Sequence, residues 1–258
     1  VVRIGDRTGN PVLWVDGPEA ILLWSKFEDT GNVTRIVDRW KYCSLWMQRL
    51  IFTNNEVVLV NKAIQIADPN QHLLGRCSPI QDKKGYLLLP LYDELEGQCV
   101  IFAGSGLQLE ERGRYGHHMI QPTLWEHTVN GETKLCSLSR NFSSNGKRSF
   151  FCESTNSGLT WSEPVPSGLH NRNNSLHVLN WNGENIVLWN DTDGRYRDKM
   201  TVGVLSESAP HVGFQEIQAT PVNVVGQRYG AYPSMCLDAA NNLNFTFTNA
   251  NRSIEHHT

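Results

Sequence analysis

Five polar residues occupy matching positions along the chain, and their side chains could line a site for a polar ligand. Four stand directly before a proline and one before a serine: Asn10, Ser78, Gln121, Asn174 and Tyr232. For Asn10, Ser78 and Asn174 a second interpretation is equally open, because Asn and Ser are common in turns beside strand starts. Gln121 and Tyr232 are not typical turn residues, so a shared polar site is the better interpretation for them.

Two adjacent carboxylates, Asp93 and Glu94 in the segment PLYDE, could supply acid or base chemistry at a strand end. Successive residues of a strand point to opposite faces, so only one of the two can face a given site. We favour Glu94, and the alternative is a pair of solvated strand-end charges. The same rule prevents the pairs His117–His118 and His256–His257 from jointly holding a metal from a regular strand. No cysteine pair has metal-ligand spacing, so no metal site is predicted.

Each of the five polar residues opens a repeated unit of two short strands. Helix signals are nearly absent, and short β-rich runs alternate with turns that carry Gly or Asn, which predicts an all-β fold. In each unit a short strand, a turn and an apolar strand follow the polar residue. The units are Asn10–Phe27, Ser78–Glu94, Gln121–Arg140, Asn174–Asp191 and Tyr232–Ala250.

The spacing of the repeats predicts a β-propeller. Successive proline-equivalent positions are 68, 43, 53 and 58 residues apart, and a four-stranded propeller blade takes roughly 40 to 50 residues. We therefore expect residues 1–258 to form one propeller domain with five recognisable blades, and a sixth that is either missing or degenerate. The first strand of a blade lines the central channel, which would bring the five polar residues to one site.

The amino-acid composition indicates which classes of binding partner are not expected. The net charge is −3 and the isoelectric point is about 6.3, so the balance does not suggest nucleic-acid binding. The longest apolar runs, such as Tyr86–Leu91, are far shorter than a membrane span. The six scattered cysteines are predicted to be buried thiols. The chain starts at Val1 rather than Met, and six Asn-x-Ser/Thr sequons slightly favour a secreted or periplasmic location over the cytoplasm.

Several of these segments together resemble one family. The octapeptide STNSGLTW, Ser154 to Trp161, is similar to an Asp-box turn, with Asn156 in place of the aspartate. The segments GNPVLWVDG, GRCSPIQDKKGYLLLPLYDE, IQPTLWEHTVNGETKLCSLSRN and AYPSMCLDAANNLNFTFTNANRSIEH follow one another in the order of inner-strand signatures. On these segments the chain resembles the sialidase (neuraminidase) superfamily, in its bacterial BNR-repeat exo-α-sialidase-like branch.

The resemblance implies a site for an acidic sugar. Sialidases hold the sugar carboxylate with arginines, which bind a carboxylate in a bidentate manner. Their nucleophile is a tyrosine, because a carboxylate nucleophile would be repelled by the sugar's own carboxylate. By position, Tyr232 resembles the nucleophile, and Arg140 and Arg197 resemble two arginines of the carboxylate site. Arg195 is the reserve candidate for Arg197. From the polar positions, Asn10 and Asn174 are further candidate substrate contacts.

The chain also departs from the family pattern. Gln121 falls where the family has the glutamate that activates the tyrosine, and an amide cannot take a proton at neutral pH. Glu94 or Glu126 would have to substitute for it. The family's first blade, which carries an Arg-x-Pro signature and the aspartate acid/base, has no clear match. By position, Arg76 could take the role of that arginine, and Asp93 or Glu94 the role of the aspartate.

Two functions therefore follow from the sequence. The first is a retaining exo-glycosidase for sialic acid or a related acidic sugar, which needs no metal or organic cofactor. The second is a non-catalytic glycan-binding or scaffolding propeller that has lost its acid and base. In both cases the expected partner is an acidic sugar or a sialylated glycan.

Overall fold

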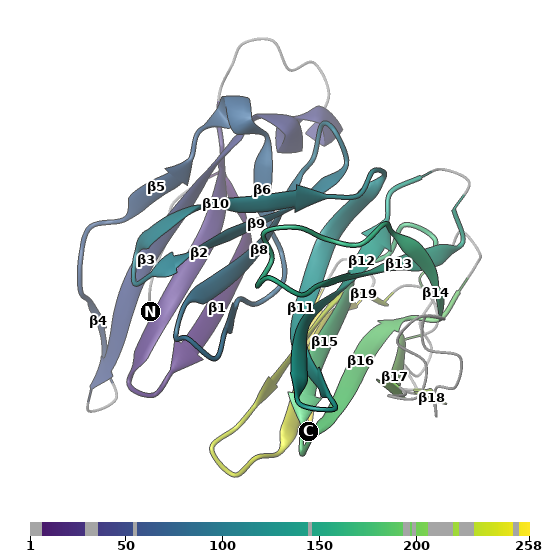
Figure 1. Ribbon diagram of the computed structural model, residues 1–258. Helices are drawn as coiled ribbons and strands as arrows, with labels where there is room; N and C mark the ends of the chain where they lie inside the picture. Colours follow the sequence, from purple (N-terminus) through teal and green to yellow (C-terminus); the bar gives the residue numbers. More distant parts are fainter. Residues whose placement is uncertain are drawn as a thin grey trace. The chain divides into compact units, whose positions relative to one another are not determined.

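The computed structural model describes residues 7–28, 36–53, 56–143, 146–192, 197, 200–205, 219–221, 230–249 and 253–258. These residues form five successive antiparallel sheets, with two short 3-10 helices (Figure 1). The chain divides into two compact units, Val1–Ile120 and Gln121–Thr258. The all-β class predicted from the sequence is confirmed, and the single domain over 1–258 stays a prediction.

The first unit holds two sheets. In the first sheet the strand order is β1-β2-β3-β4, and β5 also pairs with β3. Its strands are β1 (Thr8–Asp16), β2 (Glu19–Phe27), β3 (Cys43–Thr53), β4 (Glu56–Leu59) and β5 (Ile64–Ala67). The 3-10 helix η1 (Ile36–Tyr42) leads from β2 to β3, and η2 (Pro69–Gln71) follows β5. Asp68 caps η2 by accepting a hydrogen bond from the Asn70 N–H.

The second sheet has an interrupted inner strand. Its order is β10-β9-β8-β6, and β7 also pairs with β8. The strands are β6 (Leu73–Gly75), β7 (Ile80–Gln81), β8 (Leu87–Asp93), β9 (Gln98–Ser105) and β10 (Gln108–Tyr115). Every residue of β8 is buried, and Leu87, Leu89 and Leu91 pack into a core that the two sheets of this unit share.

The second unit holds three sheets. The third has the order β11-β12-β13-β14, the fourth β15-β16-β17-β18 and the fifth β19-β20-β21. The strands of the third sheet are β11 (Met119–Val129), β12 (Glu132–Asn141), β13 (Arg148–Ser154) and β14 (Val165–His170). Those of the fourth are β15 (Leu176–Trp181), β16 (Glu184–Asn190), β17 (Met200–Leu205) and β18 (Ala219–Pro221). The fifth contains β19 (Gly230–Leu237), β20 (Leu243–Asn249) and β21 (Ser253–His257).

The fourth sheet is packed on both faces, as strand β16 shows. Six of its seven residues are buried. Val187 and Trp189 pack in one cluster with residues of the third sheet, whereas Ile186 and Leu188 pack in another with residues of the fifth. Because alternate residues of a strand face opposite sides, a nearly continuous apolar run is what a strand between two cores requires. Trp125 lies in the first of these clusters, so Trp125 and Trp189 are both core residues.

Side chains also join the inner strands of the second unit to one another. The Thr123 hydroxyl of β11 accepts a hydrogen bond from the Val178 N–H of β15 at 3.0 Å. The His177 Nδ1 atom of β15 accepts one from the Met235 N–H of β19 at 2.8 Å. Thr123 and His177 are both buried. An Nδ1 atom that accepts carries no proton, so His177 is neutral with its proton on Nε2.

All five repeated units are antiparallel hairpins, as predicted, and they are formed by the pairs β1-β2, β7-β8, β11-β12, β15-β16 and β19-β20. The prolines distort them. The pairing of β1 shifts between Gly9 and Val12, and that of β19 shifts between Ala231 and Ser234. Pro11 and Pro233 lie inside these irregularities, since proline has no N–H to donate to the sheet.

The Asp-box segment closes the hairpin between β13 and β14, as predicted. The Asn156 Oδ1 atom accepts hydrogen bonds from the Thr160 N–H and the Ser154 hydroxyl, both at 2.9 Å. The Trp161 Nε1–H donates to the Gly158 carbonyl oxygen at 3.1 Å, and the Trp161 ring is half-buried rather than fully buried. Because an amide oxygen accepts these bonds as a carboxylate would, asparagine can replace aspartate in this turn.

Asn156→Ala is expected to destabilise the protein by about 1 to 2 kcal/mol, because two donors of the turn lose their acceptor. Asn156→Asp keeps the acceptor and is the matched control, with little change expected. Urea denaturation followed by tryptophan fluorescence measures both variants. Equal stability of Asn156→Ala and the wild type would show that the turn does not depend on this side chain.

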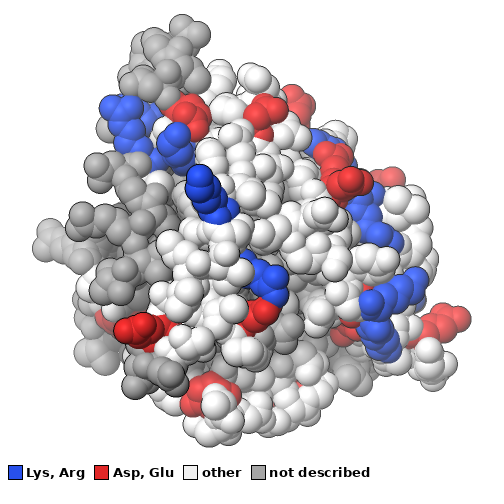
Figure 2. Space-filling view, turned by 90° about the vertical axis from the view of Figure 1, so that its left-hand side faces the viewer, with Lys and Arg blue, Asp and Glu red and all other residues white. Residues whose placement is uncertain are grey.

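The surface carries charges of both signs, and the prediction of six buried thiols is wrong for Cys236, which is exposed. Figure 2 shows basic and acidic side chains intermingled on the face it presents. All six cysteines are free, and all except Cys236 are buried. Burial raises the pKa of the Cys136 thiol to about 12 and that of Cys77 to about 11, so both stay protonated and unreactive at neutral pH. No helix among the described residues is long and apolar enough to cross a membrane.

Candidate functional site

The ends of many strands lie at one edge of the sheets in the second unit. Because neighbouring strands are antiparallel, the starts of β11, β13, β15, β17 and β19 lie at the same edge of their sheets as the ends of β12, β14 and β16. Arg140 is the penultimate residue of β12, and Tyr232 is the third residue of β19. The Asp-box is at the far end of β13, about 20 Å away along the strand. It is therefore not part of this edge.

Arg140 is the buried centre of a polar cluster at this edge, with 8% of its surface exposed. Its Nη1–H donates to the Gln121 Oε1 atom at 3.0 Å, and its Nε–H donates to the Asn173 Oδ1 atom at 2.8 Å. A buried charge requires such hydrogen bonds to offset its loss of hydration. Both acceptors are amide oxygens, so they orient the guanidinium without adding a negative charge.

Arg197 extends the same cluster. Its Nε–H donates to the Asn174 Oδ1 atom at 2.8 Å, and its Nη2–H donates to the Asn173 carbonyl oxygen at 3.1 Å. Its guanidinium carbon lies 5.2 Å from the centroid of the Tyr232 ring, within the range of a cation–π interaction. Tyr232 is 39% exposed, whereas Gln121 and Asn174 are buried. Tyr232 is thus the most exposed residue of a cluster in which Arg197 and Asn173 are half-buried.

Three residues of this cluster have a left-handed backbone conformation. The φ angles are 53° for Gln121, 56° for Asn173 and 55° for Tyr232. Asparagine tolerates this region, but glutamine and tyrosine rarely adopt it. Strained conformations of this kind cluster at functional sites, where the surrounding structure holds them.

A single buried asparagine ties the segment that carries Asn173 and Asn174 to β12. The Asn171 side chain donates to the Asn174 carbonyl oxygen at 2.8 Å and accepts from the Asn174 N–H at 3.2 Å. The same oxygen accepts from the Asn141 N–H at 3.3 Å, directly after Arg140. The segment of residues 172–175 therefore leads into the cluster in a defined conformation.

In the fourth unit, the position that corresponds to Gln121 is one residue earlier in the structure than in the alignment of the repeats from sequence. Gln121 lies nine residues before the Asn130–Gly131 turn, and Asn173 lies nine residues before the Asn182–Gly183 turn. The residue that corresponds to Gln121 is therefore Asn173, rather than Asn174 as the sequence alignment predicts. Asn174 still reaches the cluster, because its side chain binds Arg197.

The structure places three other candidate residues in the first unit. The Asn10 amide donates to the Tyr92 hydroxyl at 3.5 Å, and Asn10 also has a left-handed backbone with φ of 48°. Arg76 lies in the break between β6 and β7 and is half-buried. Ser78, the remaining polar position, lies in the same break and not at the start of a regular strand.

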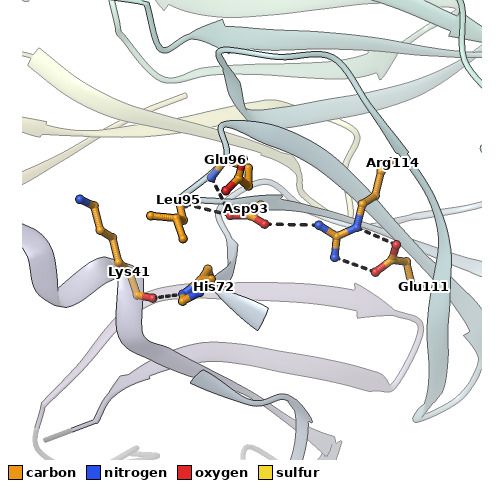
Figure 3. A network of polar contacts seen from close by, with 7 residues as sticks. All are labelled: Lys41, His72, Asp93, Leu95, Glu96, Glu111 and Arg114. Atoms are coloured by element: carbon orange, nitrogen blue, oxygen red, sulfur yellow. Dashed lines mark hydrogen bonds and ion pairs between the residues drawn. The ribbon is translucent and has the colours of Figure 1, made fainter. Parts of the chain in front are cut away.

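Figure 3 shows that Asp93, at the end of β8, belongs to a structural network. Its Oδ1 atom accepts from the N–H groups of Leu95 and Glu96, both at 2.9 Å, and its Oδ2 atom accepts from the Arg114 Nη1–H at 3.3 Å. Asp93 is 5% exposed, so this carboxylate closes the turn after β8.

The neighbouring carboxylate, Glu94, lies in that turn and is half-buried. Its N–H donates to the His72 carbonyl oxygen at 3.0 Å. Burial raises the pKa of the nearby Cys43 thiol to about 12, and the negative charges of Glu94 and Glu28 add to that increase.

The alternative carboxylate, Glu126, is five residues after Gln121 on β11, about 16 Å along the strand. At that distance Glu126 does not contact the Arg140 cluster directly. Arg195, the reserve for Arg197, lies outside the described residues. Among the described residues, no group of three His, Cys, Asp or Glu side chains could hold a metal ion.

The fold and this site define a class of protein, the BNR-repeat β-propellers of sialidase type. A family model described as a BNR repeat-like domain matches residues 1–239, and the chain belongs to this family. No curated protein matches the sequence significantly.

Solved structures of sialidases share the fold. A sialidase from Trypanosoma rangeli, in complex with difluorosialic acid as a covalent intermediate, matches with a TM-score of 0.65 and 14% identity. The match covers 94% of this chain but 42% of the sialidase chain, so the present chain spans less than half of that protein's length.

Two further solved structures are similar in fold to this chain. A protein of unknown function from Dyadobacter fermentans matches with a TM-score of 0.70 and 10% identity, over 96% of this chain and 74% of that chain. A family 43 β-xylosidase/α-arabinofuranosidase from a compost metagenome matches with a TM-score of 0.59 and 11% identity, over 96% and 94%. At these identities the likeness establishes the fold. The five sheets are blades of a sialidase-type β-propeller, which confirms the fold class predicted from the sequence.

Proposed function

We propose that this protein is a sialidase-like retaining exo-glycosidase that acts on sialic acid or a related acidic sugar. The observation that carries the proposal is the cluster in which Arg140, Arg197 and Tyr232 come together from three separate parts of the second unit. Two guanidinium groups beside an accessible phenol are suited to a ligand that carries a carboxylate next to its reactive carbon.

In the proposed reaction, Arg140 and Arg197 bind the sugar carboxylate and Tyr232 attacks the anomeric carbon, while the bond to the aglycone oxygen breaks and that oxygen leaves with a proton from an acid group. Water then attacks the anomeric carbon, gives its proton to the base, and releases the sugar and the free phenol. A neutral phenol avoids the repulsion that a carboxylate nucleophile would meet from the bound carboxylate. A carboxylate must accept the phenol proton, and Glu94 is our candidate for the acid or base. We propose that Asn10 and Arg76 contact the substrate directly. Asn174 is proposed to act on the substrate through its hydrogen bond with Arg197.

A specific observation favours a second function, the binding of acidic glycans without hydrolysis. Gln121 stands at the position where the resemblance places the activating glutamate, and its amide oxygen accepts a hydrogen bond from Arg140. An amide can orient a ligand or a hydroxyl, but it cannot take a proton at neutral pH. Such a site would still bind the sugar carboxylate but would not hydrolyse the glycosidic bond.

A single pair of measurements separates the two functions. The wild-type protein is mixed with an α-sialoside that has an aryl leaving group, and release of the aryl alcohol is followed. Binding of free sialic acid is measured by calorimetry. Turnover with release of the α-anomer supports the retaining hydrolase. Binding without turnover supports the binding protein, and the absence of both would overturn the proposed function.

A further inference from the structure

Asn173 contacts both arginines of the cluster. Its side-chain oxygen accepts from the Arg140 Nε–H at 2.8 Å, and its main-chain oxygen accepts from the Arg197 Nη2–H at 3.1 Å. The two guanidinium groups are therefore tied to the two oxygen atoms of one residue. Their separation depends on the conformation of that residue.

The backbone of Asn173 is well suited to hold this separation. Its φ of 56° is in the left-handed region, which asparagine and aspartate tolerate better than other residues with side chains. The neighbouring Asn174 main chain is bound through both its N–H and its carbonyl oxygen by the buried Asn171. The main-chain oxygen of Asn173 is thus positioned by the fold, and its side-chain oxygen is held through the hydrogen bond from Arg140.

The charge of the groups that accept hydrogen bonds from Arg140 and Arg197 affects how strongly the site can bind an anion. The oxygen atoms described above belong to Gln121, Asn173 and Asn174, and all of them are amide oxygens. A carboxylate at position 173 would make a stronger bond to Arg140, but it would also compete with an incoming anion. A neutral acceptor orients the guanidinium groups and preserves their positive potential.

We propose that Asn173 is a positioning residue that sets the spacing of Arg140 and Arg197 for a carboxylate ligand, and that its neutrality keeps this site open to an anion. The inference rests on the proposed acidic-sugar site but not on hydrolysis, so it applies to either of the two functions above.

The test compares the affinity for sialic acid with that for its methyl ester, which is neutral. Asn173→Asp retains the shape, the acceptor and the tolerance of positive φ, and adds one negative charge. We expect it to weaken binding of the free acid by about 100-fold, because like charges oppose each other at close range, and to change ester binding by less than about 3-fold. Calorimetry at constant ionic strength measures both ligands.

A second variant separates geometry from charge. Asn173→Gly keeps the left-handed backbone and the main-chain bond to Arg197 but removes the acceptor of Arg140. We expect about 10-fold weaker binding of the free acid, as one orienting hydrogen bond is lost. The matched control is Asn182→Asp, an exposed asparagine with φ of 53° in the turn at the other end of β15. It adds the same charge to the same sheet and should not alter either affinity.

The outcomes distinguish this inference from the proposed function. If the wild type binds the acid more tightly than the ester and Asn173→Asp keeps that preference, the role of Asn173 is wrong and the acidic-sugar site stands. If the wild type binds neither ligand, the proposed function falls and the inference falls with it. Circular dichroism and the melting temperature verify that each variant is folded, so that a change in acid preference reports on the site.

Discussion

Tyr232→Phe is expected to reduce hydrolysis of an aryl sialoside by at least about 10³-fold, since removal of a nucleophile removes the covalent step. Binding of free sialic acid should stay within about 2-fold of the wild type, because the variant keeps the aromatic ring beneath the Arg197 guanidinium. Initial rates with the aryl sialoside and calorimetry with the free sugar provide the two measurements.

The backbone of Tyr232 allows a control for folding. Its φ of 55° is unfavourable for tyrosine and equally so for phenylalanine, so the exchange leaves the backbone strain unchanged. Tyr232→Asn replaces both ring and hydroxyl by a residue that tolerates the conformation, and should unfold at a urea concentration no lower than the wild type. Unchanged turnover in Tyr232→Phe would remove this residue from the mechanism.

Gln121→Glu is expected to increase kcat for the aryl sialoside by about 10²-fold, because it places a proton acceptor where the resemblance locates the activating glutamate. KM should increase as well. The new carboxylate would lie about where the amide oxygen is now, 3.0 Å from Arg140, and would reduce the positive potential that binds the sugar carboxylate. Steady-state kinetics over a range of pH measure both parameters.

The matched control is Gln121→Met, which has a similar length but provides neither a proton acceptor nor an oxygen for Arg140. Its kcat should not increase. If Gln121→Glu also leaves kcat unchanged, another carboxylate already serves as the base, and Glu94→Gln then becomes the decisive variant. A gain of activity in Gln121→Glu would show that the wild-type site lacks its base at this position.

Much of the fold could be predicted from the sequence, because strands and turns carry local signals. Apolar strand-like runs and turns that carry Gly or Asn mark the five hairpins, and all five are present. The error at the fourth unit has a physical reason. The alignment relied on a proline that this unit lacks, whereas its backbone conformation places Asn173 in the position of Gln121. Counting back nine residues from the two Asn-Gly turns would have found the correct position.

The site could be predicted only in part. Arg140, Arg197 and Tyr232 were found through the resemblance, and the structure brings them into one cluster. Asn173 was missed because its role depends on a main-chain oxygen, which every residue type possesses, and on contacts between segments far apart in the sequence. The roles of Glu94, Arg76 and Asn10, in the first unit, stay predictions.

The hydrogen bonds that the Thr123 and His177 side chains accept from neighbouring inner strands have a consequence for ligand binding. Sliding one strand by a single residue would displace its polar residue by about 3.3 Å and would break these buried bonds. The three strands that begin beside Gln121, Asn173 and Tyr232 are therefore held in one axial register before any sugar arrives. For the proposed sugar ligand we therefore expect lock-and-key recognition, in which little conformational entropy is lost on association and affinity depends on complementarity.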